Sequence, residues 1–374
     1  MTSTFFFRLP HAVASHIKTL AVLFMLFWSC AVNAELLGLK DARFINSPAY
    51  KNGRGDVVKL DVMGVASDST GAIYLRTQST KTEDGATPAN RGFIVLLFKS
   101  TDGGANWQRL PVPNDNLTDM PDNERVFLNP EFIFVGERDA VFACQGLLTR
   151  SRDGGQSWKK VFIQPQEQCK YLVQQPNGTL WLAMQGQRGF RLYKSKDGGD
   201  NWTFFTDWSE SEQSWQFGVD KAETVYVSGS EILRISNGGK KKEKFPRMNP
   251  FEKYDVYVSA SDQIFLQGYH AIFIGTPPLT NIQRIHYASE KYLFKSIIDR
   301  HGNYFVNYGD GIMTVPVNEK RMIVDGTQNC IDERRSQPVT CNISQGFKID
   351  AMSVDLEGNF YVAATSGLMR QKLN

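Results

Sequence analysis

Three copies of one eight-residue pattern constrain the fold more than any other feature of this 374-residue chain. The pattern is Ser-x-Asp-Gly-Gly-x-Asn/Ser-Trp, and each copy follows a short apolar run. Its aspartate can accept hydrogen bonds from backbone N–H groups further along, and Gly-Gly supplies the positive φ angles of a tight turn. The tryptophan is expected to cover the apolar gap beneath. We therefore predict three structural hairpin turns without a catalytic role, formed by Ser100, Asp102, Gly104 and Trp107, by Ser151, Asp153, Gly155 and Trp158, and by Ser195, Asp197, Gly199 and Trp202.

These copies resemble the Asp-box, or BNR repeat, of sialidases, sortilin-type receptors, xyloglucan hydrolases and Ycf48-type photosystem assembly factors. The resemblance implies an all-β fold, a β-propeller, in which each box forms the turn between the third and fourth strands of a blade. It does not choose a function, because propellers of this kind include enzymes, receptors and assembly factors.

A second repeat, a short apolar strand with a central aromatic residue, runs through the whole chain. Successive aromatics lie 39 to 68 residues apart, whereas one propeller blade takes about 40 to 50 residues, so the larger steps indicate insertions. The repeat predicts seven blades, of which the fourth keeps only a remnant of the eight-residue pattern, Ser236–Gly239. The seven aromatics are Tyr74, Phe142, Trp181, Tyr226, Phe265, Phe305 and Tyr361.

The two ends of the chain are expected to meet. Asn374 follows closely on the third strand of the seventh blade, which would leave that sheet one strand short with an open edge. A candidate strand at residues 36–44 can fill this position. We therefore predict a seven-bladed β-propeller closed by an N-terminal strand that completes the last blade.

The first 34 residues have the features of a secretory signal peptide. Two basic residues precede an apolar run over residues 20–28, which is too short to span a bilayer, and Val32–Ala34 offers a cleavage site. The bulky Trp28 disfavours the alternative of lipoprotein processing at Cys30. We predict that residues 35–374 form a single periplasmic or secreted propeller, monomeric and without an integral membrane segment. Its formal charge of about +1 gives no argument for nucleic-acid binding.

Four cysteines remain after signal removal, and an even number in an exported chain indicates disulfides. Three pairings can be drawn. Cys330–Cys341 would close a short loop and is the natural local bridge, which leaves Cys144–Cys169. Zinc is a poor alternative, because the chain has no Cys-x-x-Cys and its remaining histidines are well separated. We predict no metal and no cofactor.

The long segments of the chain point to one face of the propeller. Short turns and the eight-residue patterns belong to the face of the 1–2 and 3–4 connections, whereas every long segment belongs to the opposite face, where binding loops are expected. These segments are residues 77–92, 112–125, 206–214 and 324–345. Cys144, at the end of a second strand, and Cys169, in a crossover, map to the same face. Trp208 beside acidic residues, and the charged loop Asp332, Glu333, Arg334 and Arg335, are the predicted contacts. Insertions that bind nothing are the alternative.

The leading hypothesis is a non-catalytic propeller that binds a protein to be assembled or neutralised, with a glycan as a second class of ligand. The enzymatic alternative is a sialidase-like exo-glycosidase. It would need three arginines gripping a carboxylate, a tyrosine nucleophile with a glutamate, and an aspartate acid/base, gathered in a central pocket. The segment around Ser47–Tyr50 lacks the arginine motif that opens such an enzyme's first blade, and no other hydrolase or nucleotide motif occurs. We therefore predict no catalytic residues.

Overall fold

The computed structural model contains only β-strands and connections in the ranges that it describes. These are residues 43–45, 48, 50–51, 55, 57–58, 60–79, 94–111, 132–136, 140–145, 147–161, 167–209, 213–229, 231–245, 253–279, 281–287, 296–298, 303–307, 312–315, 323–325, 329–332, 337–340, 349–354, 359–364 and 367–372. The predicted all-β class is therefore confirmed. No helix long and apolar enough to cross a bilayer occurs in these ranges.

Within the described ranges the strands form seven four-stranded antiparallel sheets. The first two contain β4 (Asp61–Ser67), β5 (Ile73–Ser79), β6 (Ile94–Ser100) and β7 (Gln108–Leu110), then β8 (Phe132–Val135), β9 (Val141–Gln145), β10 (Leu147–Ser151) and β11 (Lys159–Lys160). The next two contain β12 (Gln168–Gln174), β13 (Leu180–Gly186), β14 (Gly189–Ser195) and β15 (Thr203–Trp208), then β16 (Gln213–Val219), β17 (Val225–Gly229), β18 (Ile232–Ser236) and β19 (Lys241–Phe245).

The fifth and sixth sheets contain β20 (Asp255–Val258), β21 (Ile264–Gln267), β22 (Ala271–Gly275) and β23 (Gln283–Tyr287), then β24 (Ser296–Ile298), β25 (Tyr304–Asn307), β26 (Ile312–Val315) and β27 (Ile323–Asp325). The seventh contains β30 (Ile349–Val354), β31 (Asn359–Ala364), β32 (Gly367–Lys372) and β1 (Arg43–Ile45). Two small hairpins are added, β2 (Tyr50–Lys51) with β3 (Val57–Val58), and β28 (Asn329–Asp332) with β29 (Gln337–Thr340).

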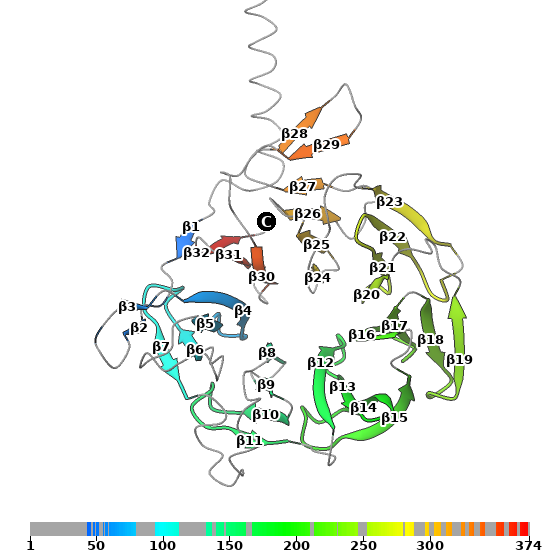
Figure 1. Ribbon diagram of the computed structural model, residues 1–374, viewed down its shortest axis with the longest axis horizontal. Helices are drawn as coiled ribbons and strands as arrows, with labels where there is room; N and C mark the ends of the chain where they lie inside the picture. Colours follow the sequence, from blue (N-terminus) through cyan, green and yellow to red (C-terminus); the bar gives the residue numbers. More distant parts are fainter. Residues whose placement is uncertain are drawn as a thin grey trace, which may run out of the picture.

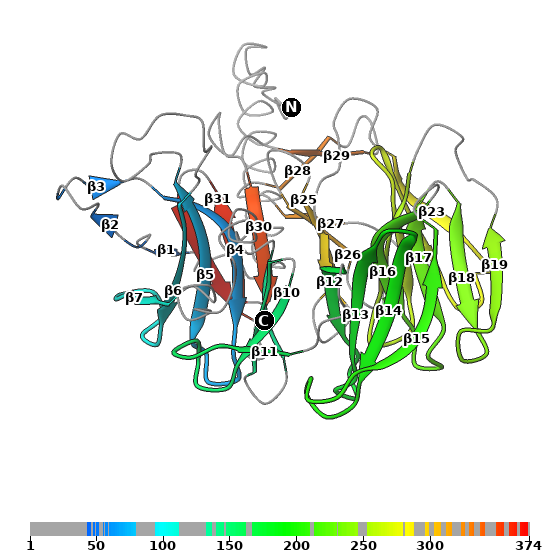
Figure 2. The same ribbon diagram turned by 60° about the horizontal axis from the view of Figure 1, so that its bottom comes forward.

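The sheets follow one another around a common centre, with the first strand of each sheet innermost (Figure 1). Figure 2 shows inner strands such as β12 and β16 running along the axis of this arrangement. Each sheet contacts the next one along the chain, and the seventh contacts the first through β30 and β4.

The first strand of the chain pairs with its last. β1 runs antiparallel to β32, and Arg43, Phe44 and Ile45 stand opposite Arg370, Met369 and Leu368. The pairing overlaps the predicted strand at residues 43 and 44, whereas residues 36–42 lie outside the described ranges.

The repeated aromatics pack between the sheets. All seven lie in the second strand of their sheet and are buried, with at most 3% of their surface exposed. Several of them also fasten the preceding turn: the Tyr74 hydroxyl donates to Asp68, the Tyr226 hydroxyl to Asp220, and the Trp181 indole to Gln175, at 2.8–3.0 Å. Apolar side chains of adjacent sheets form shared clusters, so that each sheet supplies part of its neighbour's core.

Candidate functional site

The three eight-residue repeats form the same hydrogen-bonded turn, which we call the clasp. Each connects the third and fourth strands of its sheet, as predicted. In the second clasp Ser151 Oγ donates to Asp153 Oδ1 (2.7 Å) and accepts from the Gly155 N–H (2.7 Å), while the Ser157 N–H donates to Asp153 Oδ1 (2.9 Å). The first and third clasps repeat these bonds. In each clasp the aspartate therefore accepts hydrogen bonds from the turn itself.

Each clasp also joins its sheet to the preceding one. Trp158 is buried in the cluster shared by the first two sheets, and its indole donates to the Pro111 carbonyl at 3.0 Å. Gly155 lies so close to Leu110 that a Cβ there would stand 2.6 Å from that side chain. Trp107 and Trp202 pack in the same way against the clusters shared with the sheets before theirs.

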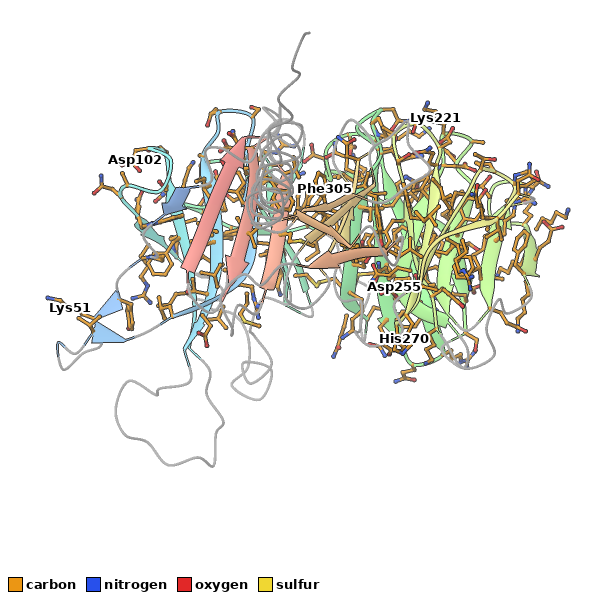
Figure 3. All side chains as sticks on the ribbon, turned by 90° about the horizontal axis from the view of Figure 1, so that it is seen from above. Lys51, Asp102, Lys221, Asp255, His270 and Phe305 are labelled. Atoms are coloured by element: carbon orange, nitrogen blue, oxygen red, sulfur yellow. A yellow bond between two sulfur atoms is a disulfide. The ribbon has the colours of Figure 1, made fainter. Side chains whose placement is uncertain are left out.

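The clasps and the 2–3 turns lie on opposite faces. In Figure 3 Asp102 of the first clasp and Lys221 of the β16–β17 turn lie at one face, whereas His270 of the β21–β22 turn lies at the other. The registers agree, since Gly189 at the 2–3 turn and Ser195 at the clasp are opposite ends of β14.

A charged cleft of about 460 Å³ opens on the face opposite the clasps. We call it the rim cleft. The β13–β14 turn forms one wall, the end of β15 another, and Glu167, just before β12, a third. Its charged residues are Glu167, Arg188, Arg191, Asp207 and Lys242.

Most charges in the rim cleft are paired. Glu167 is buried and accepts from the Arg191 guanidinium and from the Tyr193 hydroxyl (3.1 Å). Burial, followed by the Glu167 charge, raises the pKa of Tyr193. Lys242 Nζ binds the Asp207 carboxylate at 2.7 Å. Arg188 is exposed and has no ion pair or hydrogen bond from its side chain to any described residue. The cleft therefore presents one exposed cation, Arg188, beside two ion pairs.

A disulfide stabilises the wall of the rim cleft. Cys144 and Cys169 are bonded, with Cα atoms 5.9 Å apart, so this predicted pairing is confirmed. Cys169 belongs to the first strand of the third sheet, where it faces Met184, and not to the crossover that the sequence predicted. The bond thus joins the second and third sheets two residues beyond Glu167. The other predicted bridge involves Cys341, which lies outside the described residues, and the Cys330 side chain is likewise not described.

The predicted contact at Trp208 is wrong. This side chain is 5% exposed, stacks on Phe190 with ring centroids 5.7 Å apart, and meets Phe217 edge-on at 6.3 Å. β15 continues through Trp208 and β16 begins at Gln213, so residues 206–214 are mostly strand and not an insertion. The neighbouring Asp207 is the exposed residue and belongs to the rim cleft.

Of the other predicted contacts, only Asp332 lies in the described residues. Asp332 ends β28 and stands opposite Gln337 of β29, while Glu333, Arg334 and Arg335 lie outside the described residues, as do 80–93 and 112–131. The rim cleft was not predicted from the sequence, because its walls come from segments that are distant along the chain.

A second cavity, of about 380 Å³, lies among the innermost strands, and we call it the central cavity. Its walls belong to β8, β12, β16, β20 and β24, and they carry Tyr171 and Tyr257 among mostly apolar residues. No arginine is among the residues that line it. Burial raises the pKa of Asp255, at the start of β20, to about 6. Burial and the Asp255 charge raise the pKa of both Tyr171 and Tyr257.

Two observations on the described residues concern a metal centre and a sialidase-like pocket. Within them no group of three or more His, Cys, Asp or Glu side chains is placed to hold a metal ion. A sialidase-like site would bring arginines to a central tyrosine, but the residues that line the central cavity include Tyr171 and Tyr257 and no arginine.

Comparison with known proteins gives one partial sequence match and several similar folds. The chain is 29% identical over 161 residues to the photosystem II assembly lipoprotein Ycf48 of Synechococcus sp. (strain CC9902). The chain is similar to Ycf48. The match spans 40% of this chain and 44% of that relative, less than half the length of either. No family model matches the chain.

Solved structures share the fold at low sequence identity. A structure of Ycf48 bound to D1 peptide superposes with a TM-score of 0.56 and 11% identity, covering 87% of this chain and 95% of Ycf48. Ycf48 from Cyanidioschyzon merolae gives 0.55 and 12%, covering 89% and 98%. A streptogramin B lyase gives 0.58 and 13%, also covering 89% and 98%. These likenesses place the chain among propeller folds and, at such identities, say nothing about its chemistry.

Proposed function

We propose that this chain is an exported, non-catalytic β-propeller that binds a protein partner through the face opposite the clasps. The fold we propose has seven blades and is closed by the N-terminal strand. Seven four-stranded sheets, the β1–β32 pairing and the contact of β30 with β4 support this architecture. A closed ring leaves no open edge and gives its loops a rigid base.

The rim cleft is the observation that carries the functional proposal. Arg188 offers a guanidinium with five donors to solvent, and the ion pairs of Arg191 and Lys242 hold the walls around it. A polar, preorganised surface of this kind favours contact with a protein, because few side chains lose freedom on binding.

The likeness to Ycf48 supports a protein partner. One solved structure shows Ycf48 bound to D1 peptide, so a propeller of this shape binds a peptide. The partner of the present chain is a proposal of its own, since the matched sequence spans less than half of Ycf48.

The β28–β29 hairpin is a second proposed contact on the same face. It lies in the connection from the fourth strand of the sixth sheet to the first strand of the seventh. Asp332 stands opposite Gln337 in this hairpin, and we propose that Glu333, Arg334 and Arg335, which lie between them in the sequence, contact the partner. We propose that a Cys330–Cys341 disulfide closes the base of this hairpin, since Cys330 lies near the start of β28 and Cys341 directly follows the last residue of β29 in the sequence.

The proposal requires export to the periplasm or the medium. Residues 1–34 have the sequence of a signal peptide, and the interior disulfide of Cys144 and Cys169 fits an oxidising compartment. Residues 35–374 would then be the active form.

Affinity capture with two matched variants tests the proposal. Tagged residues 35–374, Arg188→Glu and Lys221→Glu would be exposed to periplasmic or extracellular extract, and bound proteins quantified by mass spectrometry. Both substitutions reverse an exposed cation, but Lys221 lies on the clasp face (Figure 3). We expect one partner to be retained by the native protein and Lys221→Glu, and reduced at least about tenfold in Arg188→Glu. Loss with Lys221→Glu alone, or turnover of a fluorogenic sialoside, would contradict the proposal.

A further inference from the structure

A carboxyl group lies beside the lining of the central cavity: Asp255 directly precedes three lining residues on β20, and its charge acts on the lining residues Tyr171 and Tyr257. Asp255 opens β20, one residue before the stretch Val256–Val258 that lines the cavity, and keeps part of its surface exposed. In Figure 3 Asp255 lies between the two faces, nearer the face of His270 than the clasp face of Lys221. No hydrogen bond or ion pair reaches its carboxylate from the residues that the structure describes, and burial alone accounts for its raised pKa.

The polar groups around Asp255 are committed elsewhere. The Tyr257 hydroxyl, on the same side of β20 as Asp255, hydrogen-bonds to the Gln216 side chain and to the backbone of Ser296. The Tyr304 hydroxyl lies 2.7 Å from Gln267 Oε1. The Asp255 charge acts on both tyrosines, and also on Tyr171 from the third sheet. These groups shape the surroundings of the carboxylate without neutralising it.

The walls of the central cavity are apolar and aromatic. They include Phe134, Tyr171, Phe217 and Tyr257, and the volume of about 380 Å³ lies within the usual range for small-molecule sites. Aromatic faces attract cations, and a buried carboxylate is stabilised by a partner that brings both positive charge and N–H donors. An anionic ligand would be repelled by Asp255.

We propose that the central cavity binds a small ligand with an apolar body and a protonated amine, and that Asp255 pairs with the ammonium group. An ammonium group fits better than a metal ion, because hard cations take six or more oxygen ligands and one carboxylate cannot supply them. This site is separate from the rim cleft and does not depend on the proposed protein partner.

Calorimetric titration of residues 35–374 with 2-phenylethylamine at pH 8 tests the proposal. The uncharged 2-phenylethanol and the anionic 3-phenylpropionate have the same ring and similar length, so they isolate the contribution of charge. We expect the amine to bind and the two analogues to bind at least about tenfold more weakly. Asp255→Asn should weaken amine binding by a similar factor, whereas Glu243→Gln, on the outer strand β19, should leave it unchanged.

Proton release supplies a readout that needs no variant. An ammonium group that pairs with the Asp255 carboxylate favours its ionised form, so binding at pH 6 should release about half a proton per amine. Titrations in two buffers of different ionisation enthalpy measure this number. The proposal is overturned if the amine does not bind, if the alcohol binds equally well, if Asp255→Asn binds the amine as the native protein does, or if no proton is released at pH 6.

Discussion

At the scale of single residues, the buried serine of each clasp matters more than its exposed partners. Ser151 Oγ accepts from the buried Gly155 N–H, and no solvent replaces it when it is removed. Ser151→Ala should therefore lower the free energy of unfolding by about 1 to 3 kcal/mol. The control Ser157→Ala removes an exposed hydroxyl of the same turn and should cost less than about 1 kcal/mol. Equal losses in urea denaturation would contradict this ranking.

Asp255 gives the stability of the protein a distinct pH dependence. Its pKa is about 6 in the folded chain and near 3.8 in the unfolded one. The folded state therefore binds the extra proton between these values, and stability falls as pH rises through this window. The loss is at most about 3 kcal/mol. Asp255→Asn should remove this fall and be more stable above pH 6, as thermal unfolding from pH 4 to 8 can measure. Parallel profiles for the two proteins would refute the assignment.

At the scale of elements, the features that were predicted correctly from the sequence are those set by residues close together in the chain. The Asp-Gly-Gly turns and the second-strand aromatics depend on neighbours within a few residues, so their pattern is visible in the sequence. Two further hydrogen bonds, from Tyr74 to Asp68 and from Tyr226 to Asp220, join an aspartate to the tyrosine six residues after it. This spacing is also visible in the sequence.

Trp208 and the rim cleft were not predicted correctly, because both depend on contacts between residues that are distant in the sequence. Trp208 is buried because Phe190 and Phe217, from two other strands, cover it. The acidic residues that follow it in the sequence suggested instead that it is exposed. The rim cleft combines Glu167, Arg188 and Lys242, which come together only when the third and fourth sheets pack. No short sequence motif identifies a site of this kind.

The turn remnant of the fourth sheet still requires its second glycine. A Cβ at Gly239, which has φ +87°, would stand 2.4 Å from the Phe205 carbonyl oxygen, and backbone cannot yield as a side chain does. Gly238, at φ +61°, has open space around it. We expect Gly238→Ala to cost about 1 to 2 kcal/mol and Gly239→Ala distinctly more. Urea unfolding of the two variants decides this, and similar losses would show that the fourth sheet does not pack as described.

At the scale of the whole molecule, stability depends on joints between sheets. The Cys144–Cys169 bond joins the second and third sheets across 25 residues of chain. Replacement of both cysteines by serine should lower the free energy of unfolding by about 2 to 4 kcal/mol. Because Cys169 lies beside Glu167, partner capture should weaken as well. Unchanged stability in the double variant would mean that packing alone holds this joint.

Hydrogen–deuterium exchange of residues 35–374, alone and with the captured partner, tests the central claim most directly. We predict that binding slows exchange at the β13–β14 turn, residues 186–189, and at the start of β12 beside Glu167. The three clasps, at the other end of the same sheets, should exchange at unchanged rates. Protection confined to the clasps, with the β13–β14 turn unaffected, would contradict the claim that partners bind the opposite face.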